Sequence, residues 1–159
     1  FPKDEQAGFQ RFVTAPTTVS GTDDLSLASI VHHYEQSRLF AKGGNVHFFH
    51  YADLSHDLRG QITRLSGLLN VSLSPGLLDE IAEANTFSSM RKTAEESPFR
   101  YHEKSPFIDN AAFFASGTSN KWEGRLAQDD LDRFDRQFAN LLPQDDIDWL
   151  KWGAARSPR

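Results

Sequence analysis

The apolar positions along this chain repeat mostly with helical spacing. Phe9, Phe12 and Val13 predict a first helix, which we expect to end before Pro16 because a residue that precedes proline disfavours the α-helical conformation. The apolar residues of segment 25–42 follow the i, i+3, i+4, i+7 rule of an amphipathic helix, and the Gly-Gly pair that follows ends it. The first part of the chain is therefore predicted to hold two helices joined by a polar connection.

Further helical stripes follow, and several have a clear start signal. Ser55 or Asp57 can cap a helix whose apolar stripe runs from Leu58 to Leu69. Ser74-Pro75 is a capping residue followed by a proline at the first helical position. The remaining predicted segments are a short helix at 86–92 capped by Thr86, a helix at 128–142, and a short apolar segment at 147–152.

One segment departs from helical spacing. Residues 46–51, Val-His-Phe-Phe-His-Tyr, form a short run of β-branched and aromatic residues between a glycine and an aspartate. Their length and composition favour a strand buried on both faces, as in a parallel sheet. A lone strand would leave backbone donors and acceptors unpaired in the core. Either its partner strands lie outside these residues, or the segment is not a strand.

Two segments show little periodicity. Residues 94–110 contain two prolines and scattered charge, so we expect a long surface loop of the kind that often forms a lid or a binding segment. Residues 154–159 are expected to form a frayed tail.

The composition excludes several classes of protein. The chain has 159 residues, 38% of them hydrophobic, and its 13 phenylalanines argue against a disordered acidic tail. A net charge of −5 argues against nucleic acid as the main partner. No run approaches the length of a membrane span. The absence of cysteine excludes disulfides and thiolate sites and fits a reducing compartment, so we expect a cytoplasmic protein.

The histidines and aspartate clusters do not predict a metal site. His47 and His50 would point to opposite faces of the predicted strand, and no HExxH pattern occurs. The aspartates of 129–135 and 145–148 are expected to complement helix dipoles or to lie on a solvated face. The chain also lacks the GxSxG, GxxxxGK[ST] and GxGxxG motifs.

Two short motifs remain as candidate binding elements. Tyr51 stands at the C-terminal end of the predicted strand, where ligands bind in open α/β sheets and an aromatic ring can stack on a base. The more ordinary interpretation is a core tyrosine whose hydroxyl has a hydrogen-bond partner. In segment 113–122, Phe-Phe-Ala-Ser-Gly-Thr-Ser-Asn-Lys-Trp, small residues allow backbone N–H groups to face a phosphate or sulfate. Its ordinary interpretation is a Gly-Ser turn.

In this order and spacing, the motifs resemble the C-terminal part of the sulfotransferase family that uses 3′-phosphoadenosine 5′-phosphosulfate. The family's Tyr-x-Asp-Leu-x-x-Asp element is matched by Tyr51–Asp57, and its Thr/Ser-Phe-x-x-Met element by Thr86–Met90. Its Phe-Phe-x-x-Gly-x-x-x-x-Trp element is matched by Phe113–Trp122. The resemblance runs from about Asn45 to Gly153.

The resemblance implies an α/β fold, the P-loop-like three-layer sulfotransferase fold. This chain would be its mostly helical C-terminal part, with about one parallel strand. Residues 1–159 would form the C-terminal portion of a single sulfotransferase domain, without the N-terminal half that carries the phosphosulfate loop and the general base. The opening Phe1-Pro2-Lys3-Asp4, with no initiator methionine, agrees with an internal starting point.

The implied enzyme moves a sulfuryl group from 3′-phosphoadenosine 5′-phosphosulfate to a hydroxyl or amine of a small molecule, glycan or lipid, without a metal. No catalytic residue is assigned within this chain, and the isolated chain is expected to be inactive. The resemblance assigns part of the nucleotide cradle to six residues: Tyr51, Thr86 and Phe87 at the adenine, and Phe114, Ser116 and Gly117 toward the 3′-phosphate. The ordinary alternative for Phe87 and Phe114 is core packing.

Two elements of the sequence depart from the family pattern around the 3′-phosphate. Pro2-Lys3-Asp4 resembles the family's Arg-x-Pro-x-Asp-x-x-x-Ser stretch, but Gly8 stands where the serine is expected. Ala115-Ser116 replaces a basic pair that usually precedes the glycine of the later motif. Ser116, Lys121 and loop N–H groups could substitute in part.

Two other classes stay open. A non-catalytic helical interaction module would use all of these aromatics as core, and a nucleotide-dependent kinase would share a related core. The identity of the acceptor would lie in segment 94–110 and in the absent half. The family's usual dimer signature is not matched after Trp122, so the oligomeric state stays open.

Overall fold

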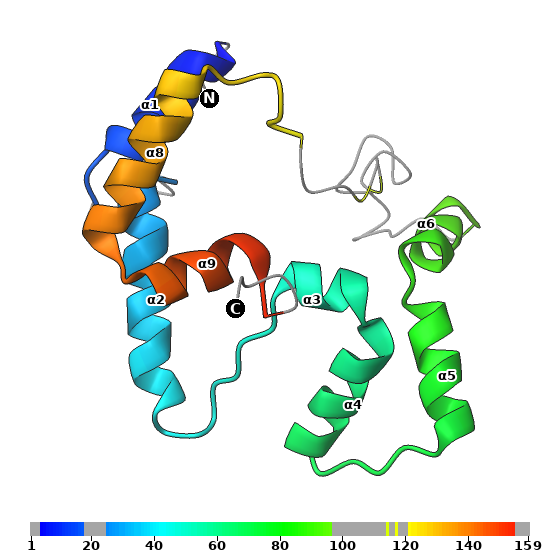
Figure 1. Ribbon diagram of the computed structural model, residues 1–159. Helices are drawn as coiled ribbons and strands as arrows, with labels where there is room; N and C mark the ends of the chain where they lie inside the picture. Colours follow the sequence, from blue (N-terminus) through cyan, green and yellow to red (C-terminus); the bar gives the residue numbers. More distant parts are fainter. Residues whose placement is uncertain (1–3, 18–24, 97–113, 115–116, 118–120, 155–159) are drawn as a thin grey trace, which may run out of the picture. The chain divides into compact units, whose positions relative to one another are not determined.

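The computed structural model describes residues 4–17, 25–96, 114, 117 and 121–154, and these residues form eight helices and no strand (Figure 1). The helices are α1 (Glu5–Thr14), α2 (Leu27–Ala41), α3 (Tyr51–His56), α4 (Leu58–Leu68), α5 (Pro75–Ala84), α6 (Phe87–Glu96), α8 (Gln128–Leu141) and α9 (Gln144–Trp152). The chain divides into two compact units, one of residues 1–50 with 120–159 and one of residues 51–119.

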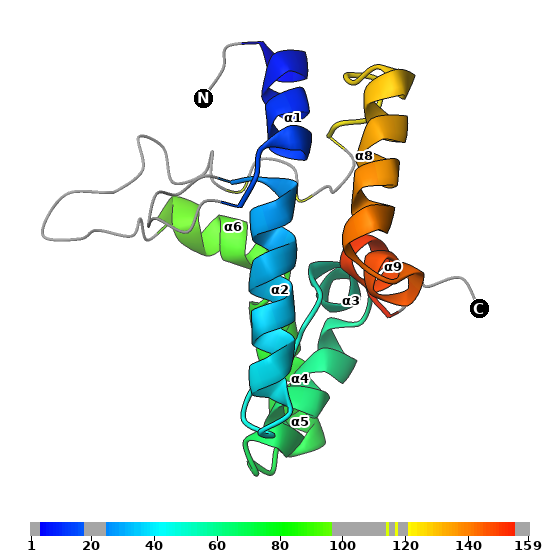
Figure 2. The same cartoon turned by 90° about the vertical axis from the view of Figure 1, so that its left-hand side faces the viewer.

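The first unit is a set of four packed helices. Here α1 packs against both α2 and α8, α2 also packs against α8, and α8 packs against α9. Figure 2 shows α1 and α8 side by side. The predicted end of α1 is confirmed at Thr14, just before Ala15-Pro16, and α8 ends at Leu141, within one residue of the predicted limit. The helix α9 begins at Gln144, earlier than the apolar segment at 147–152 that the sequence indicates. Residues 18–24, which the sequence predicts as a polar connection, lie outside the described residues.

The core of the first unit lies between α2, α8 and α9. Its buried hydrophobic residues come from all three helices and from the junction between α8 and α9. They are Leu27, Val31, Tyr34, Phe138, Leu142 and Ile147. Half-buried aromatic residues pack around them, including Trp149, whose ring stacks on Tyr34 with centroids 5.9 Å apart. The apolar stripes read from the sequence therefore face one another across this core.

Two aspartates in the first turns of α8 and α9 also bind side chains of other helices. Asp130 is buried and accepts hydrogen bonds from Gln6 and Gln10 of α1. Asp146 accepts a hydrogen bond from the Tyr34 hydroxyl at 2.9 Å. Both stand in the first turn of their helix, where the sequence predicts that an aspartate complements the helix dipole. The pattern within one helix could not show that they also meet donors from another helix.

The predicted strand is not observed among the described residues. Residues 46–50 have no regular secondary structure, and Tyr51 begins α3 rather than ending a strand. Phe48 of this segment packs against the core of the first unit, with its ring 5.8 Å from that of Trp149. A strand needs a neighbour to share its backbone hydrogen bonds, and the described residues supply none.

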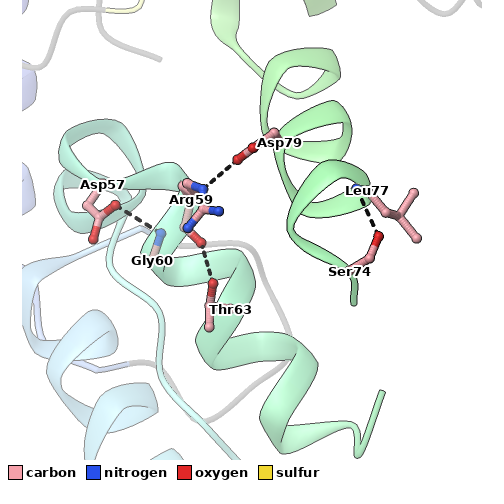
Figure 3. A network of polar contacts seen from close by, with 7 residues as sticks. All are labelled: Asp57, Arg59, Gly60, Thr63, Ser74, Leu77 and Asp79. Carbon is pink, nitrogen blue, oxygen red and sulfur yellow. Dashed lines mark hydrogen bonds and ion pairs between the residues drawn. The ribbon is translucent and has the colours of Figure 1, made fainter. Parts of the chain in front are cut away.

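The second unit is a series of helices in which α3 packs on α4, α4 on α5, and α5 on α6 (Figure 1). An ion pair between Arg59 of α4 and Asp79 of α5, with Nε and Oδ1 2.6 Å apart, joins the middle pair (Figure 3). Both ends of this pair are exposed, so its contribution to stability is small.

Side-chain caps begin α4 and α5, as the sequence predicts. The Asp57 carboxylate accepts a hydrogen bond from the Gly60 backbone N–H at 2.9 Å, and the Ser74 hydroxyl accepts one from that of Leu77 at 3.3 Å (Figure 3). A Cβ at position 60 would collide with the Asp57 carboxylate in its present position, so a larger residue there would require the Asp57 side chain to shift. The caps satisfy N–H groups that the first helical turn leaves without partners.

Candidate functional site

The N-terminus of α6 is built on a hydroxyl cap. Thr86 Oγ1 accepts a hydrogen bond from the Ser89 backbone N–H at 3.2 Å and donates to the Glu83 carbonyl oxygen at 3.0 Å. Ser89 Oγ lies 2.9 Å from the same hydroxyl oxygen. The sequence predicts the Thr86 cap, and the structure confirms it. It also adds Ser89 to the candidate site, and the Thr-x-x-Ser spacing of a capped first turn is the signal that could have identified this residue.

The first residue of α6, Phe87, contacts two residues that come near the C-terminal end of the second unit's sequence, Phe114 and Gly117. Its ring lies 5.8 Å from that of Phe114, and the two rings are inclined at 69°, an edge-to-face arrangement. Both side chains are half-buried. Residues that are 27 positions apart in the sequence are therefore neighbours, as a shared binding element requires.

Gly117 completes this group. Its φ is +61°, and a Cβ built there would lie 3.0 Å from both Cδ2 and Cε2 of the Phe87 ring. Position 117 requires glycine for two reasons: the left-handed backbone conformation and the close approach to an aromatic ring. We call Phe87, Phe114 and Gly117 the aromatic–glycine cluster.

The other two predicted site residues are placed differently. Tyr51 is 56% exposed and begins α3, whereas α6 is at the other end of the helix series of this unit. Ser116 lies outside the described residues. The structure thus brings together Thr86 and the aromatic–glycine cluster, and the shared site of Tyr51 and Ser116 stays a prediction.

The chemistry available at this group follows from its residue types. An exposed phenol ring such as Tyr51 can stack on a planar base, and the face of a half-buried phenylalanine can do the same. The absence of a side chain at Gly117 lets the Phe87 ring approach the backbone closely. The Thr86 hydroxyl already takes part in four contacts, so a ligand atom that binds it must displace one of them. The Ser88 and Ser89 hydroxyls are side-chain partners that can rotate away.

Within the described residues, no group of three or more metal-ligating side chains comes together. None of the described helices has the length and apolar character needed to cross a membrane.

Comparison with known proteins gives the class. The model of the sulfotransferase domain family matches residues 2–146 of the chain, which is most of its length. The chain belongs to the sulfotransferase domain family, and the resemblance read from its motifs is confirmed. This membership implies the P-loop-like α/β fold of the family, while the described residues are helical.

Individual relatives are distant. The chain is 27% identical over 128 residues to a glycolipid sulfotransferase of Mycobacterium bovis (strain BCG / Pasteur 1173P2), an alignment that covers 80% of this chain and 39% of the relative. It is 29% identical over 96 residues to an amine sulfotransferase of Oryctolagus cuniculus, covering 59% of this chain and 32% of that protein. The chain thus spans about two fifths or less of the length of these curated relatives. No solved structure matches it.

Proposed function

We propose that the protein to which this chain belongs transfers a sulfuryl group from 3′-phosphoadenosine 5′-phosphosulfate to a hydroxyl or amine. The match of the family model to residues 2–146 is the observation that carries this proposal. The acceptor would be a small molecule, a glycan or a lipid, and relatives named for glycolipid and amine acceptors support that range. The protein would act in the cytoplasm.

In the proposed reaction, the acceptor oxygen or nitrogen forms a bond to sulfur while the bond between sulfur and the phosphate oxygen of the donor breaks. The leaving group is 3′,5′-adenosine bisphosphate, and the acceptor proton passes to a base. Such transfers depend on positioning and on cationic charge near the transferred group. We propose that this chain is the C-terminal portion of one sulfotransferase domain and that the base and the phosphosulfate loop belong to the rest of it.

Within that reaction, this chain supplies part of the nucleotide cradle. Tyr51, Thr86 and Phe87 would hold the adenine, and Phe114, Ser116 and Gly117 would approach the 3′-phosphate. The contact of Gly117 with the Phe87 ring supports this assignment. It brings a residue of the motif at 113–122 next to a residue of the motif at 86–90. Thr86 would contribute both by capping α6 and by exchanging its contact with Ser89 for a ring nitrogen.

A nucleotide-binding measurement on the full-length protein tests the proposal. We expect 3′,5′-adenosine bisphosphate to raise the melting temperature, because a ligand that binds the folded state stabilises it. Tyr51→Ala should weaken binding about fivefold to a hundredfold, since stacking of a base on an aromatic ring contributes roughly 1–3 kcal/mol. Phe40→Ala is the matched control, because Phe40 is an aromatic residue of α2 with 67% exposure and no assigned role.

The outcomes separate the classes of protein. No shift with the bisphosphate would favour a non-catalytic helical module whose aromatics only pack. Transfer of labelled phosphate rather than labelled sulfate from the corresponding donors would indicate a kinase. The isolated chain of 159 residues is expected to sulfate no acceptor, and detectable sulfation by it alone would overturn the assignment of the catalytic base to residues outside it.

A further inference from the structure

The helices α5 and α6 of the second unit are joined by only two residues, Asn85 and Thr86 (Figure 1). Residues 69–74, by contrast, separate α4 from α5. Backbone rotation is limited to φ and ψ, so a connection of two residues leaves few directions in which α6 can continue from α5. We call Asn85 and Thr86 the α5–α6 corner. The direction of α6 therefore depends on how firmly this corner is held.

The Asn85 side chain closes the end of α5. Its Nδ2 donates a hydrogen bond to the Ile81 carbonyl oxygen at 2.8 Å, and its backbone N–H donates to the same oxygen at 3.2 Å. A carbonyl oxygen only accepts, so the amide nitrogen is the part of the side chain that makes this contact. The last carbonyl groups of a helix are those that need such outside partners. Asn85 is thus bound to the last turn of α5 through both its backbone and its side chain.

Thr86 joins the corner to both helices. Its backbone N–H and its hydroxyl both donate to the Glu83 carbonyl oxygen of α5, at 3.2 and 3.0 Å. On the side of α6, its hydroxyl accepts a hydrogen bond from the Ser89 backbone N–H at 3.2 Å, and its carbonyl oxygen accepts one from that of Met90 at 2.9 Å. Because Thr86 follows Asn85 directly, a shift of Asn85 moves the start of α6 as well.

The ring of Phe87 comes directly after this corner and has little room to move. Phe87 is the first residue of α6 and is half-buried. A Cβ built on Gly117 would lie 3.0 Å from two of its ring atoms, and the centroid of the Phe114 ring lies 5.8 Å from its own. Closely packed groups lose contact energy when a gap of even a fraction of an ångström opens between them. The α5–α6 corner and the aromatic–glycine cluster therefore have to fit each other.

We propose that Asn85 is a positioning residue of the nucleotide cradle. Its amide holds the α5–α6 corner, and the corner holds the Phe87 ring in the orientation that the adenine contacts. Asn85 acts through Phe87 and does not itself bind the nucleotide. The inference rests on the proposed function, because it requires that an adenine nucleotide binds beside Phe87. It adds to the cradle a residue that the motifs of the sequence do not include.

Calorimetric titration of the full-length protein with 3′,5′-adenosine bisphosphate tests this role. Asn85→Leu keeps a branched side chain of similar shape and removes the donor to the Ile81 carbonyl oxygen. We expect it to weaken binding about threefold to tenfold, because the loss of one hydrogen bond loosens the orientation of Phe87. Ser74→Ala is the matched control, since it removes a side-chain hydrogen bond from the other end of α5. It should lower the melting temperature by a similar amount and leave the affinity unchanged.

Combination with a Phe87 variant separates positioning from a direct or a general effect. Phe87→Leu removes the aromatic face and keeps an apolar side chain. In that background we expect Asn85→Leu to weaken binding by less than about twofold, because the ring through which Asn85 acts is absent. Circular dichroism checks that each variant is folded. If Asn85→Leu is not, Asn85→Ala, which places fewer apolar atoms at this exposed position, replaces it in both backgrounds.

Each remaining outcome overturns one specific statement. If the wild-type protein does not bind the bisphosphate, the proposed function fails. If it binds and Phe87→Leu leaves the affinity unchanged, Phe87 does not belong to the cradle and Asn85 cannot act through it. If Phe87→Leu weakens binding and Asn85→Leu does not, the proposed function stands and the role of Asn85 is wrong.

The two comparisons also separate other causes of a lower affinity. An equal loss from Asn85→Leu in both backgrounds would show that Asn85 does not act through Phe87. A loss in Ser74→Ala as large as that in Asn85→Leu would assign the effect to stability rather than to positioning.

Discussion

At the scale of single residues, Gly117 shows how a local backbone conformation and a tertiary contact can demand the same residue. Its φ of +61° is unfavourable for residues with a Cβ, and the Phe87 ring occupies the space that a Cβ would need. The motif of the sequence names this glycine, but only the structure supplies both reasons.

We expect Gly117→Ala to destabilise the aromatic–glycine cluster by roughly 1–2 kcal/mol from backbone strain, before any shift of the Phe87 ring. It should also weaken binding of 3′,5′-adenosine bisphosphate. Gly67→Ala is the control, because Gly67 lies in α4 with open space around its Cβ position, and alanine there should be neutral or stabilising. Equal melting temperatures and affinities in the two variants would contradict the expected role of Gly117.

At the scale of helices, a polar connection between α2 and α9 accompanies their apolar contact. The Tyr34 hydroxyl donates to Asp146 Oδ1 at 2.9 Å, and the Arg38 guanidinium forms an ion pair with the other carboxylate oxygen. Burial, together with the hydrogen bond to Asp146, raises the pKa of Tyr34 above its ordinary value of 10.0. The phenol is therefore held in its protonated form across the contact.

This raised pKa sets the pH dependence of the Tyr34 contribution. Because the pKa of Tyr34 is higher in the folded than in the unfolded state, its contribution to stability is complete below pH 10 and is lost as the pH rises through the folded-state value. Tyr34→Phe should lower the free energy of unfolding by roughly 1–3 kcal/mol at pH 8, and this difference from the wild type should narrow above pH 10.

Denaturant unfolding of both proteins between pH 8 and pH 11 measures that difference. Asp146→Asn keeps a hydrogen-bond acceptor but removes the charge, which lowers the folded-state pKa of Tyr34. In that variant background the difference between tyrosine and phenylalanine at position 34 should therefore be smaller and should narrow over a shorter range of pH above 10. A difference between wild type and Tyr34→Phe that stays constant to pH 11 would show that the Tyr34 pKa is not raised.

At the scale of the whole molecule, the described apolar core is concentrated in the first unit. Phe138 of α8 is 4% exposed and belongs to the core cluster, whereas Phe40 of α2 is 67% exposed in the same unit. Phe138→Ala should lower the free energy of unfolding by about 3–5 kcal/mol, because it leaves a cavity between α2, α8 and α9. Phe40→Ala should change it by less than about 0.5 kcal/mol.

Chemical denaturation followed by circular dichroism compares these two phenylalanine variants. The comparison isolates burial, since both substitutions remove the same atoms from a helix of the same unit. Comparable losses of stability in the two variants would show that α2 is covered near Phe40 by a further part of the folded protein, and the core would then have to be redrawn.

Much of the element-level structure was predictable because its causes are local. A capping side chain acts within three residues, as Asp57 does on Gly60 and Ser74 on Leu77. Proline restricts the residue just before it, which places the end of α1. The composition of residues 46–50 was not sufficient to predict their secondary structure, because a strand forms only with partner strands, and a local pattern does not show whether these are present.

The candidate site likewise has features that the sequence could predict and contacts that it could not. The order of the motifs along the chain was enough to indicate the sulfotransferase family, which the family model matching residues 2–146 confirms. By itself the sequence also determined most of the helices, the caps of α4, α5 and α6, and the residue types offered to a nucleotide, because these depend on neighbours in the chain. Only the tertiary structure decided that Gly117 lies against Phe87 and that Asp130 is bonded to Gln6 and Gln10. Contacts between distant residues arise when apolar faces are buried together, and that choice of partners depends on the packing of the folded chain.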